Sequence, residues 1–224
     1  MSDIVKNMSR KNRKIINFGT IGNILIFVSL CLLFLIFYPI VKWELSYRVK
    51  ESQDITYQIV ANKEELKDVK EDKKVKILVP PNTNFSIVIP KIEAVAPVIS
   101  EVDYRDPEKF LPELKKGVAH AMGTPYPNES GNVYIFAHST DAFYNVNYYN
   151  AVFYLLGKLE KGDEIVLFYK DKKYIYSVSE VKVVSKDDTY YLGKLSEGKT
   201  LTLQTCYPPG TTLKRLVVIS TLVD

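Results

Sequence analysis

The last quarter of the chain shows the clearest alternation of apolar and polar residues. Residues 201–205 run Leu, Thr, Leu, Gln, Thr, a period of two that predicts a strand with one buried face. Cys206 follows, and residues 207–210 (Tyr-Pro-Pro-Gly) end the strand, because proline cannot donate to a ladder and glycine permits a tight turn. Residues 213–223 resume an apolar, β-rich run with Arg215 near its start. The pattern predicts two strands joined by a turn, with the thiol and the guanidinium at the same end.

Similar short apolar segments recur from residue 75 onward, separated by prolines, glycines or charged turns. They predict further strands at residues 77–79, 85–89, 94–99, 133–137, 164–169 and 173–184. Asp106, Pro107 and Glu108 are typical first residues of a helix, which we expect to end near Leu114. Apolar residues at helical spacing predict a second helix over 147–159. About eight short strands with two or three short helices predict a mostly antiparallel β-barrel with helices in its loops.

The N-terminal part has a different pattern. Residues 15–41 contain no charged residue, and residues 24–41 are rich in Leu, Ile and Phe, which is long enough to cross a bilayer. The basic residues that precede this run predict a cytoplasmic N-terminus. A cleaved signal peptide is the alternative, but the run is longer than an ordinary signal-peptide core and no small-residue cleavage site follows it. We therefore expect a basic cytoplasmic tail at 1–14, a transmembrane anchor at 15–41, a charged stalk, helical or irregular, at 42–74, and a folded extracellular domain at 75–224.

Charge and cysteine content reduce the number of function classes that fit the chain. The five basic residues and one acidic residue of the tail account for the whole net charge of +4. The remaining chain is neutral, which argues against nucleic-acid binding. The chain has two cysteines, and Cys31 lies in the apolar run, so a disulfide framework is excluded and Cys206 is expected to carry a thiol. We find no acidic cluster typical of a metal site and expect no cofactor.

Three residues are candidates for catalysis. A cysteine nucleophile needs a proton-transferring partner and an oxyanion stabiliser that converge on one carbonyl. Arg215 would favour the thiolate of Cys206 and stabilise an oxyanion. His138 directly follows a buried strand and should lie at the barrel rim, whereas His120 follows Gly-Val-Ala in a loop after the short helix. From the residues alone, a buried structural cysteine and a structural histidine remain open alternatives.

Residues 202–206, Thr-Leu-Gln-Thr-Cys, resemble the Thr-Leu-x-Thr-Cys motif of sortases, the membrane-anchored cysteine transpeptidases of mainly Gram-positive bacteria. The similarity extends to the chain order His, Cys, Arg and to a single N-terminal anchor. It covers residues 75–224 and implies an eight-stranded sortase-like β-barrel. Further similar segments are Ile-Pro-Lys-Ile at 89–92, Gly-Val-Ala-His at 117–120, the run 131–138 ending in histidine, and residues 213–218.

The resemblance implies a mechanism. The Cys206 thiolate would attack a C-terminal sorting signal of a secreted protein, such as Leu-Pro-x-Thr-Gly, while Arg215 binds the substrate and the oxyanion. His138 would protonate the leaving amine and then deprotonate an incoming amine, from a peptidoglycan cross-bridge or a pilin lysine. Weaker substrate-binding candidates are Thr205, His120 and Tyr207. The compact chain, without a long lid, resembles housekeeping or class D and E sortases.

Two other functions stay open. A cell-surface cysteine hydrolase or protease would use water as the acceptor, but such families usually place the cysteine before the histidine in sequence. A non-catalytic, membrane-anchored peptide-binding module would tolerate loss of Cys206 or Arg215, and both are present.

Overall fold

The computed structural model of the chain describes residues 18–51, 55–61, 75–139, 152–193 and 198–223. Contacts divide the chain into two units, residues 1–38 and 39–224. Helix α1 (Phe18–Glu51) exposes large apolar side chains, among them Ile24, Phe27 and Leu35. Within the described residues, however, no helix reaches the combined length and apolarity of a bilayer span, so the anchor predicted at 15–41 is not found there.

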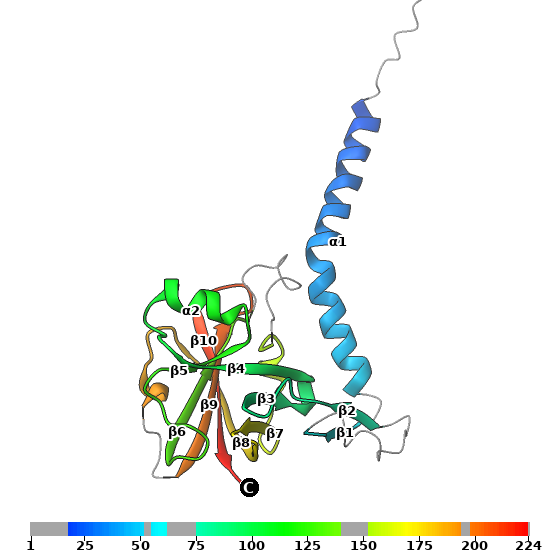
Figure 1. Ribbon diagram of the computed structural model, residues 1–224. Helices are drawn as coiled ribbons and strands as arrows, with labels where there is room; N and C mark the ends of the chain where they lie inside the picture. Colours follow the sequence, from blue (N-terminus) through cyan, green and yellow to red (C-terminus); the bar gives the residue numbers. More distant parts are fainter. Residues whose placement is uncertain (1–17, 52–54, 62–74, 140–151, 194–197, 224) are drawn as a thin grey trace, which may run out of the picture. The chain divides into compact units, whose positions relative to one another are not determined.

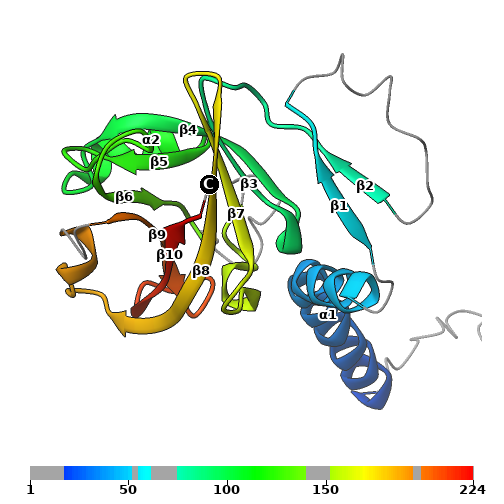
Figure 2. The same ribbon diagram turned by 90° about the horizontal axis from the view of Figure 1, so that it is seen from below.

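Eight strands close into a barrel. Figures 1 and 2 show how these strands are arranged. Around the barrel the order is β10-β8-β7-β3-β4-β5-β6-β9. The pairs β4–β5 and β6–β9 are parallel and the other six are antiparallel, which confirms the mostly antiparallel barrel. The strands are β3 (Phe85–Ile89), β4 (Ala94–Val102), β5 (Val118–Ala121), β6 (Gly131–Phe136), β7 (Glu164–Tyr169), β8 (Lys172–Ser185), β9 (Lys199–Tyr207) and β10 (Lys214–Leu222).

Both faces of the wall formed by β6, β9 and β10 are packed. Side chains of a strand point alternately to its two faces. Val133 and Ile135 of β6 therefore join Leu203 of β9 in the barrel interior. Tyr134 and Phe136 belong instead to a second apolar cluster on the outer face. That cluster includes Leu114 of α2 (Pro107–Leu114), so the helix covers part of the outer face.

Helix α2 begins as the sequence predicts. The Asp106 side chain accepts a hydrogen bond from the backbone N–H of Glu108 at 3.0 Å, and Pro107 occupies the first helical position. Capping of this kind satisfies an amide that has no partner within the helix. The cap fixes where the helix starts, and the helix forms one wall of the cavity described below.

Two predictions of local structure were wrong, and one predicted strand lies outside the barrel. The helix predicted over 147–159 is, within its described part 152–159, a turn followed by the single 3-10 turn η3 (Leu156–Lys158). The stalk contains a strand, β1 (Thr56–Ile59), because Tyr57 and Ile59 pack on the apolar outer cluster around Val88 and Phe168. The strand predicted at 77–79 is confirmed as β2 (Val75–Leu78), but it pairs in parallel with β1 in a separate sheet and is not part of the barrel.

Candidate active site

Cys206 and Arg215 lie directly opposite each other on the antiparallel strands β9 and β10. Directly opposed residues of such a pair project from the same face, with Cβ atoms about 5 Å apart. The face is the outer one, because the alternating partners Thr205 and Leu216 are both buried. The predicted juxtaposition of thiol and guanidinium is therefore confirmed, and it is a direct cross-strand pair.

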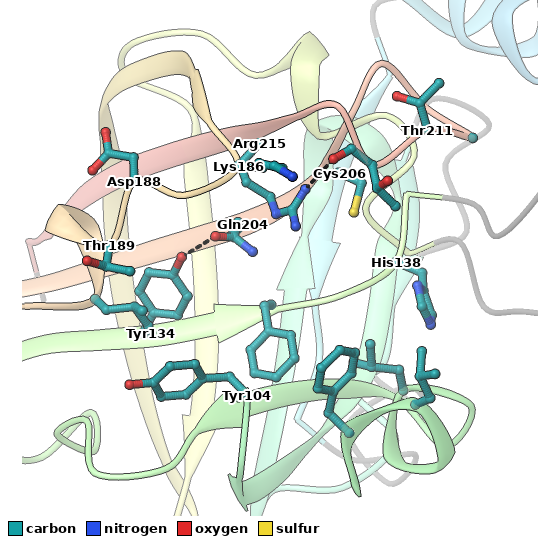
Figure 3. Close-up of a pocket in the computed structure, with 17 residues that line it drawn as sticks. Tyr104, Tyr134, His138, Lys186, Asp188, Thr189, Gln204, Cys206, Thr211 and Arg215 are labelled. Atoms are coloured by element: carbon teal, nitrogen blue, oxygen red, sulfur yellow. Dashed lines mark hydrogen bonds between the residues drawn. The ribbon is translucent and has the colours of Figure 1, made fainter. Parts of the chain in front are cut away.

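His138 comes from the neighbouring strand on the other side of β9. Phe136 of β6 is in register with Gln204, and the Ala137 N–H donates to the Gln204 carbonyl at 3.1 Å, which continues the parallel pairing by one residue. One further step of the same register brings His138 beside Cys206. The Cys206 side chain lies between the Arg215 guanidinium and the His138 ring (Figure 3). Three neighbouring strands thus supply one residue each to a single row on the outer face.

This row borders a cavity of about 370 Å³. One wall is apolar and comes from α2, whereas the opposite wall is polar and comes from the segment after β8. The floor consists of β6 and β9 side chains (Figure 3). The apolar wall includes Phe110, Leu111 and Leu114; the polar wall Lys186, Asp188 and Thr189; the floor Tyr134, Phe136 and Gln204.

The turn between β9 and β10 holds the Arg215 guanidinium. Its Nη1 donates to the carbonyls of Thr212 at 3.2 Å and Lys214 at 3.1 Å. The turn itself is closed by Thr211, whose N–H and hydroxyl both donate to the Pro208 carbonyl. Among the described residues, none accepts a hydrogen bond from Nε or Nη2. Arg215 is half-buried, so these donors remain available to a ligand carbonyl or oxyanion.

The floor contains a polar pair that sequence analysis missed. The Tyr134 hydroxyl donates to the Gln204 side-chain oxygen at 2.5 Å. Burial raises the pKa of Tyr134 well above its usual value, so this hydroxyl stays protonated and remains a donor. The sequence did contain a signal for this pair, because side chains of a strand alternate between its two faces. Tyr134 stands an even number of positions before His138, and Gln204 an even number before Cys206, so each should share the face of the residue that it precedes.

A second set of hydrogen bonds that sequence analysis did not predict, centred on Asn132, holds the polar wall in place. The Asn132 side-chain nitrogen donates to the Tyr191 carbonyl at 2.8 Å in the 3-10 turn η4 (Tyr190–Leu192). Its oxygen accepts from the hydroxyls of Thr200 at 3.1 Å and Thr202 at 3.0 Å. All three polar side chains are buried, so the hydrogen bonds are shielded from water. Asn132 thereby ties the segment that carries the polar wall to the strand pair below the site.

The structure does not bring the three weaker candidates to the cavity. Thr205 is 2% exposed, faces away from Cys206 and donates to the Ala137 carbonyl at 3.0 Å, which joins the ends of β9 and β6. Tyr207, 37% exposed, ends β9 and does not line the cavity.

His120 was predicted to lie in a loop, and this prediction was wrong, because it lies in β5. It is 0% exposed inside the barrel, where its Nε2 bonds with Pro125 and Thr124 and its ring stacks on Tyr126. The strand begins directly after Gly117, at a close approach of two backbones that the sequence pattern does not reveal. A Cβ at position 117 would come within 2.3 Å of the Pro97 carbonyl oxygen of β4. Only glycine lets the chain enter β5 so close to its neighbour.

The part of the chain that the structure describes contains no group of three or more His, Cys, Asp or Glu side chains that could hold a metal ion. It also contains no disulfide, and the half-buried Cys206 carries a thiol. The row brings a thiol beside an imidazole and a guanidinium, and this combination suits nucleophilic attack by sulfur.

Comparisons with known proteins point to one family. Residues 87–223 match the sortase domain family. Sortase D of Bacillus subtilis is 33% identical over 133 residues, which are 58% of this chain and 59% of that protein. A solved structure of a sortase D transpeptidase of Clostridium perfringens is 25% identical with a TM-score of 0.52, covering 72% of this chain and 86% of that one. The solved structure of sortase C-1 of Actinomyces oris is 29% identical with a TM-score of 0.52, and the match covers 62% of this chain and 73% of that one.

Proposed function

This chain belongs to the sortase family, and we propose that it is a cysteine transpeptidase acting on a C-terminal sorting signal of secreted proteins. The observation that carries the proposal is the placement of Cys206, Arg215 and His138 on three neighbouring strands at one end of a cavity. The cavity lies between an apolar wall and a polar wall, and a peptide is the ligand class that suits it.

The first half-reaction transfers the acyl group to sulfur. His138 holds the proton of the Cys206 thiol while the sulfur attacks the carbonyl carbon of the scissile amide, and the unused donors of Arg215 stabilise the negative charge that develops on oxygen. As the C–N bond breaks, His138 gives a proton to the leaving amine. The products are a thioester on Cys206 and a released C-terminal peptide.

The second half-reaction regenerates the thiol. An amine attacks the thioester carbonyl, His138 accepts a proton from that amine, and the C–S bond breaks. A new amide results, and Cys206 is free for another cycle. We propose a peptidoglycan cross-bridge amine or a pilin lysine as the acceptor.

The location of the enzyme is part of the proposal. We infer that residues 1–14 are cytoplasmic, that residues 15–41 attach the chain to the cell membrane, and that the barrel lies outside the cell. The uncharged run in the sequence and the exposed apolar side chains of α1 support this inference. Fractionation of cells that express residues 1–224 or 42–224 tests it, because only the longer chain should sediment with membranes.

The activity is tested with the full chain in detergent, a panel of Leu-Pro-x-Thr-Gly-like peptides and an amine donor, followed by mass spectrometry. We expect a ligated product and an acyl adduct on Cys206. Cys206→Ala should give neither, whereas Cys31→Ala, which removes the other thiol, should give both. Hydrolysis without ligation at saturating amine would assign the site to a hydrolase. A folded protein that forms no adduct with any peptide would contradict the proposal.

A further inference from the structure

The loop between β9 and β10 begins with a tight turn. The Thr211 N–H donates to the Pro208 carbonyl at 3.0 Å, which closes a β-turn over residues 208–211. The proline at position 209 holds its φ at about −65°. Gly210 follows with a φ of 79°. These two angles define a type II turn, and its third position favours glycine because a Cβ is strained at positive φ.

The Thr211 side chain adds a second bond to the same carbonyl. Its hydroxyl donates to the Pro208 oxygen at 2.8 Å. The N–H bond alone closes a turn of this type, so the hydroxyl is not needed for the turn itself. Rotation about the N–Cα bond of Thr211 would move the hydroxyl away from the carbonyl that the N–H binds. The two bonds together therefore fix the direction in which the chain leaves the turn.

The chain leaves the turn towards the two carbonyls that bind Arg215. The first belongs to Thr212, the residue directly after Thr211, and accepts from Nη1 at 3.2 Å. The second belongs to Lys214 and accepts from the same nitrogen at 3.1 Å. Because the backbone before Thr212 is fixed by the turn, the direction of the Thr212 carbonyl is fixed as well. The Thr211 hydroxyl is thus connected to the guanidinium through one stretch of backbone.

The guanidinium passes this restraint on to its free donors. It is a rigid planar group, so a bond to one nitrogen sets the plane in which the other two lie. Arg215 lies directly opposite Cys206, and among the described residues none accepts from its Nε or Nη2. These donors therefore have a set direction before a substrate arrives. Donors that are oriented beforehand stabilise an oxyanion without a cost of reorganisation.

We propose that Thr211 is a positioning residue for the transpeptidase reaction. Its hydroxyl, bonded to the Pro208 carbonyl, keeps the Arg215 guanidinium directed at Cys206 and at the oxygen that becomes negative there. The inference rests on the proposed function, because it takes Arg215 to stabilise that oxygen. In this role Thr211 acts only through Arg215, so its substitution should matter only while the arginine is present.

The first test is a double-mutant cycle on acylation. Single-turnover formation of the Cys206 thioester is followed by mass spectrometry on the full chain in detergent, with a peptide of the Leu-Pro-x-Thr-Gly type. Thr211→Val keeps the shape of the side chain without the hydroxyl and should slow acylation about three- to tenfold, the effect of one neutral hydrogen bond. Arg215→Ala should slow it at least about 10²-fold. Adding Thr211→Val to Arg215→Ala should give no further loss.

The second test needs no substrate. A guanidinium held beside a thiol favours the thiolate, so the pH of half-maximal alkylation of Cys206 by iodoacetamide reports the position of Arg215. Thr211→Val should move this midpoint to higher pH, and Arg215→Ala should move it further. In the Arg215→Ala background, Thr211→Val should leave the midpoint unchanged. The peptide that contains Cys206 is analysed, because Cys31 also carries a thiol.

Three further variants act as controls. Thr211→Ser retains the hydroxyl and should react within about twofold of the unsubstituted chain. Thr221→Val makes the same change at an exposed threonine near the other end of β10 and should alter neither the rate nor the midpoint. If Thr211→Val fails to fold, Gly210→Ala strains the same turn at its positive φ and should show the same dependence on Arg215.

The outcomes separate this inference from the proposed function. An equal loss from Thr211→Val with and without Arg215 would overturn the inference. Unchanged rates and midpoints in Thr211→Val, or a Thr211→Ser variant as slow as Thr211→Val, would overturn it too. If no peptide acylates the unsubstituted chain, the proposed function fails, and the alkylation midpoints alone decide whether Thr211 positions Arg215.

Discussion

One histidine of the chain lies in β5 and the other follows the neighbouring strand β6, on the opposite face of the barrel wall. His120 of β5 points into the interior, where it is fully buried and bonds with Pro125 and Thr124. His138 follows β6 on the outer face and borders the cavity beside Cys206. Residue type therefore does not decide which histidine is available for chemistry. The face of the wall decides it, and strand parity determines the face.

The same division runs along β9. Leu201, Leu203 and Thr205 face inward, and Gln204 and Cys206 face the cavity. Substitutions on the inner face should lower stability, and substitutions on the outer face should lower activity. Adjacent residues of one strand thus provide matched pairs that test the division.

The largest expected effect concerns the two histidines. His138→Gln should slow acyl transfer by about 10²–10⁴-fold, because the proton donor and acceptor is lost while the fold remains. His120→Gln should change the rate of the folded protein by less than about threefold. Single-turnover acylation and deacylation, measured on protein shown to be folded by near-UV circular dichroism, checks both. Equal losses in the two variants would contradict the division.

A second pair concerns stability. Leu203→Ala should lower the free energy of unfolding by about 2–5 kcal/mol, because Leu203 is fully buried in the barrel interior and its truncation leaves a cavity. Gln204→Leu, one residue along the strand, should change it by less than about 1 kcal/mol. Urea unfolding of both variants gives the comparison. A Gln204→Leu variant as unstable as Leu203→Ala would show that the outer face also belongs to the core.

On the outer face, the hydrogen-bonded group around Asn132 should affect both stability and activity. Asn132→Ala leaves the Thr200 and Thr202 hydroxyls and the Tyr191 carbonyl buried without their partner, at a cost of about 1–3 kcal/mol. It also releases the polar wall, so KM for the peptide should rise with little change in kcat. Thr202→Val, which removes a single hydroxyl, should have a smaller effect on stability and none on KM. A uniform loss of kcat in Asn132→Ala would contradict a wall-positioning role.

Sequence patterns predicted the placement of Cys206 and Arg215 better than the surroundings of the site. The period-two run ending at Cys206, the tight turn and the position of Arg215 depend on neighbours in the chain, so they could be predicted. The Asn132 group and the Tyr134–Gln204 pair join residues about 60–70 positions apart, and no local pattern contains that information. His120 was misplaced because the strand around it is four residues long and begins at a close approach between two backbones.

The smallest expected effect is a pH dependence of stability from the inner histidine. Burial lowers the pKa of His120 below its ordinary value of 6.5. The hydrogen bond to the Pro125 carbonyl and the nearby carboxylates of Glu101 and Glu129 oppose this only in part. Well above pH 6.5 the residue is neutral in both the folded and the unfolded chain and contributes no slope. As the pH falls from 6.5 towards the lowered folded pKa, the unfolded chain takes up a proton that the folded chain does not, so stability declines. Urea midpoints between pH 5 and 7.5 should therefore fall more steeply for the unsubstituted chain than for His120→Gln, which cannot titrate. Parallel curves would mean that the interior accommodates an imidazolium, and the contrast between the two faces would then lie in access to the substrate rather than in charge.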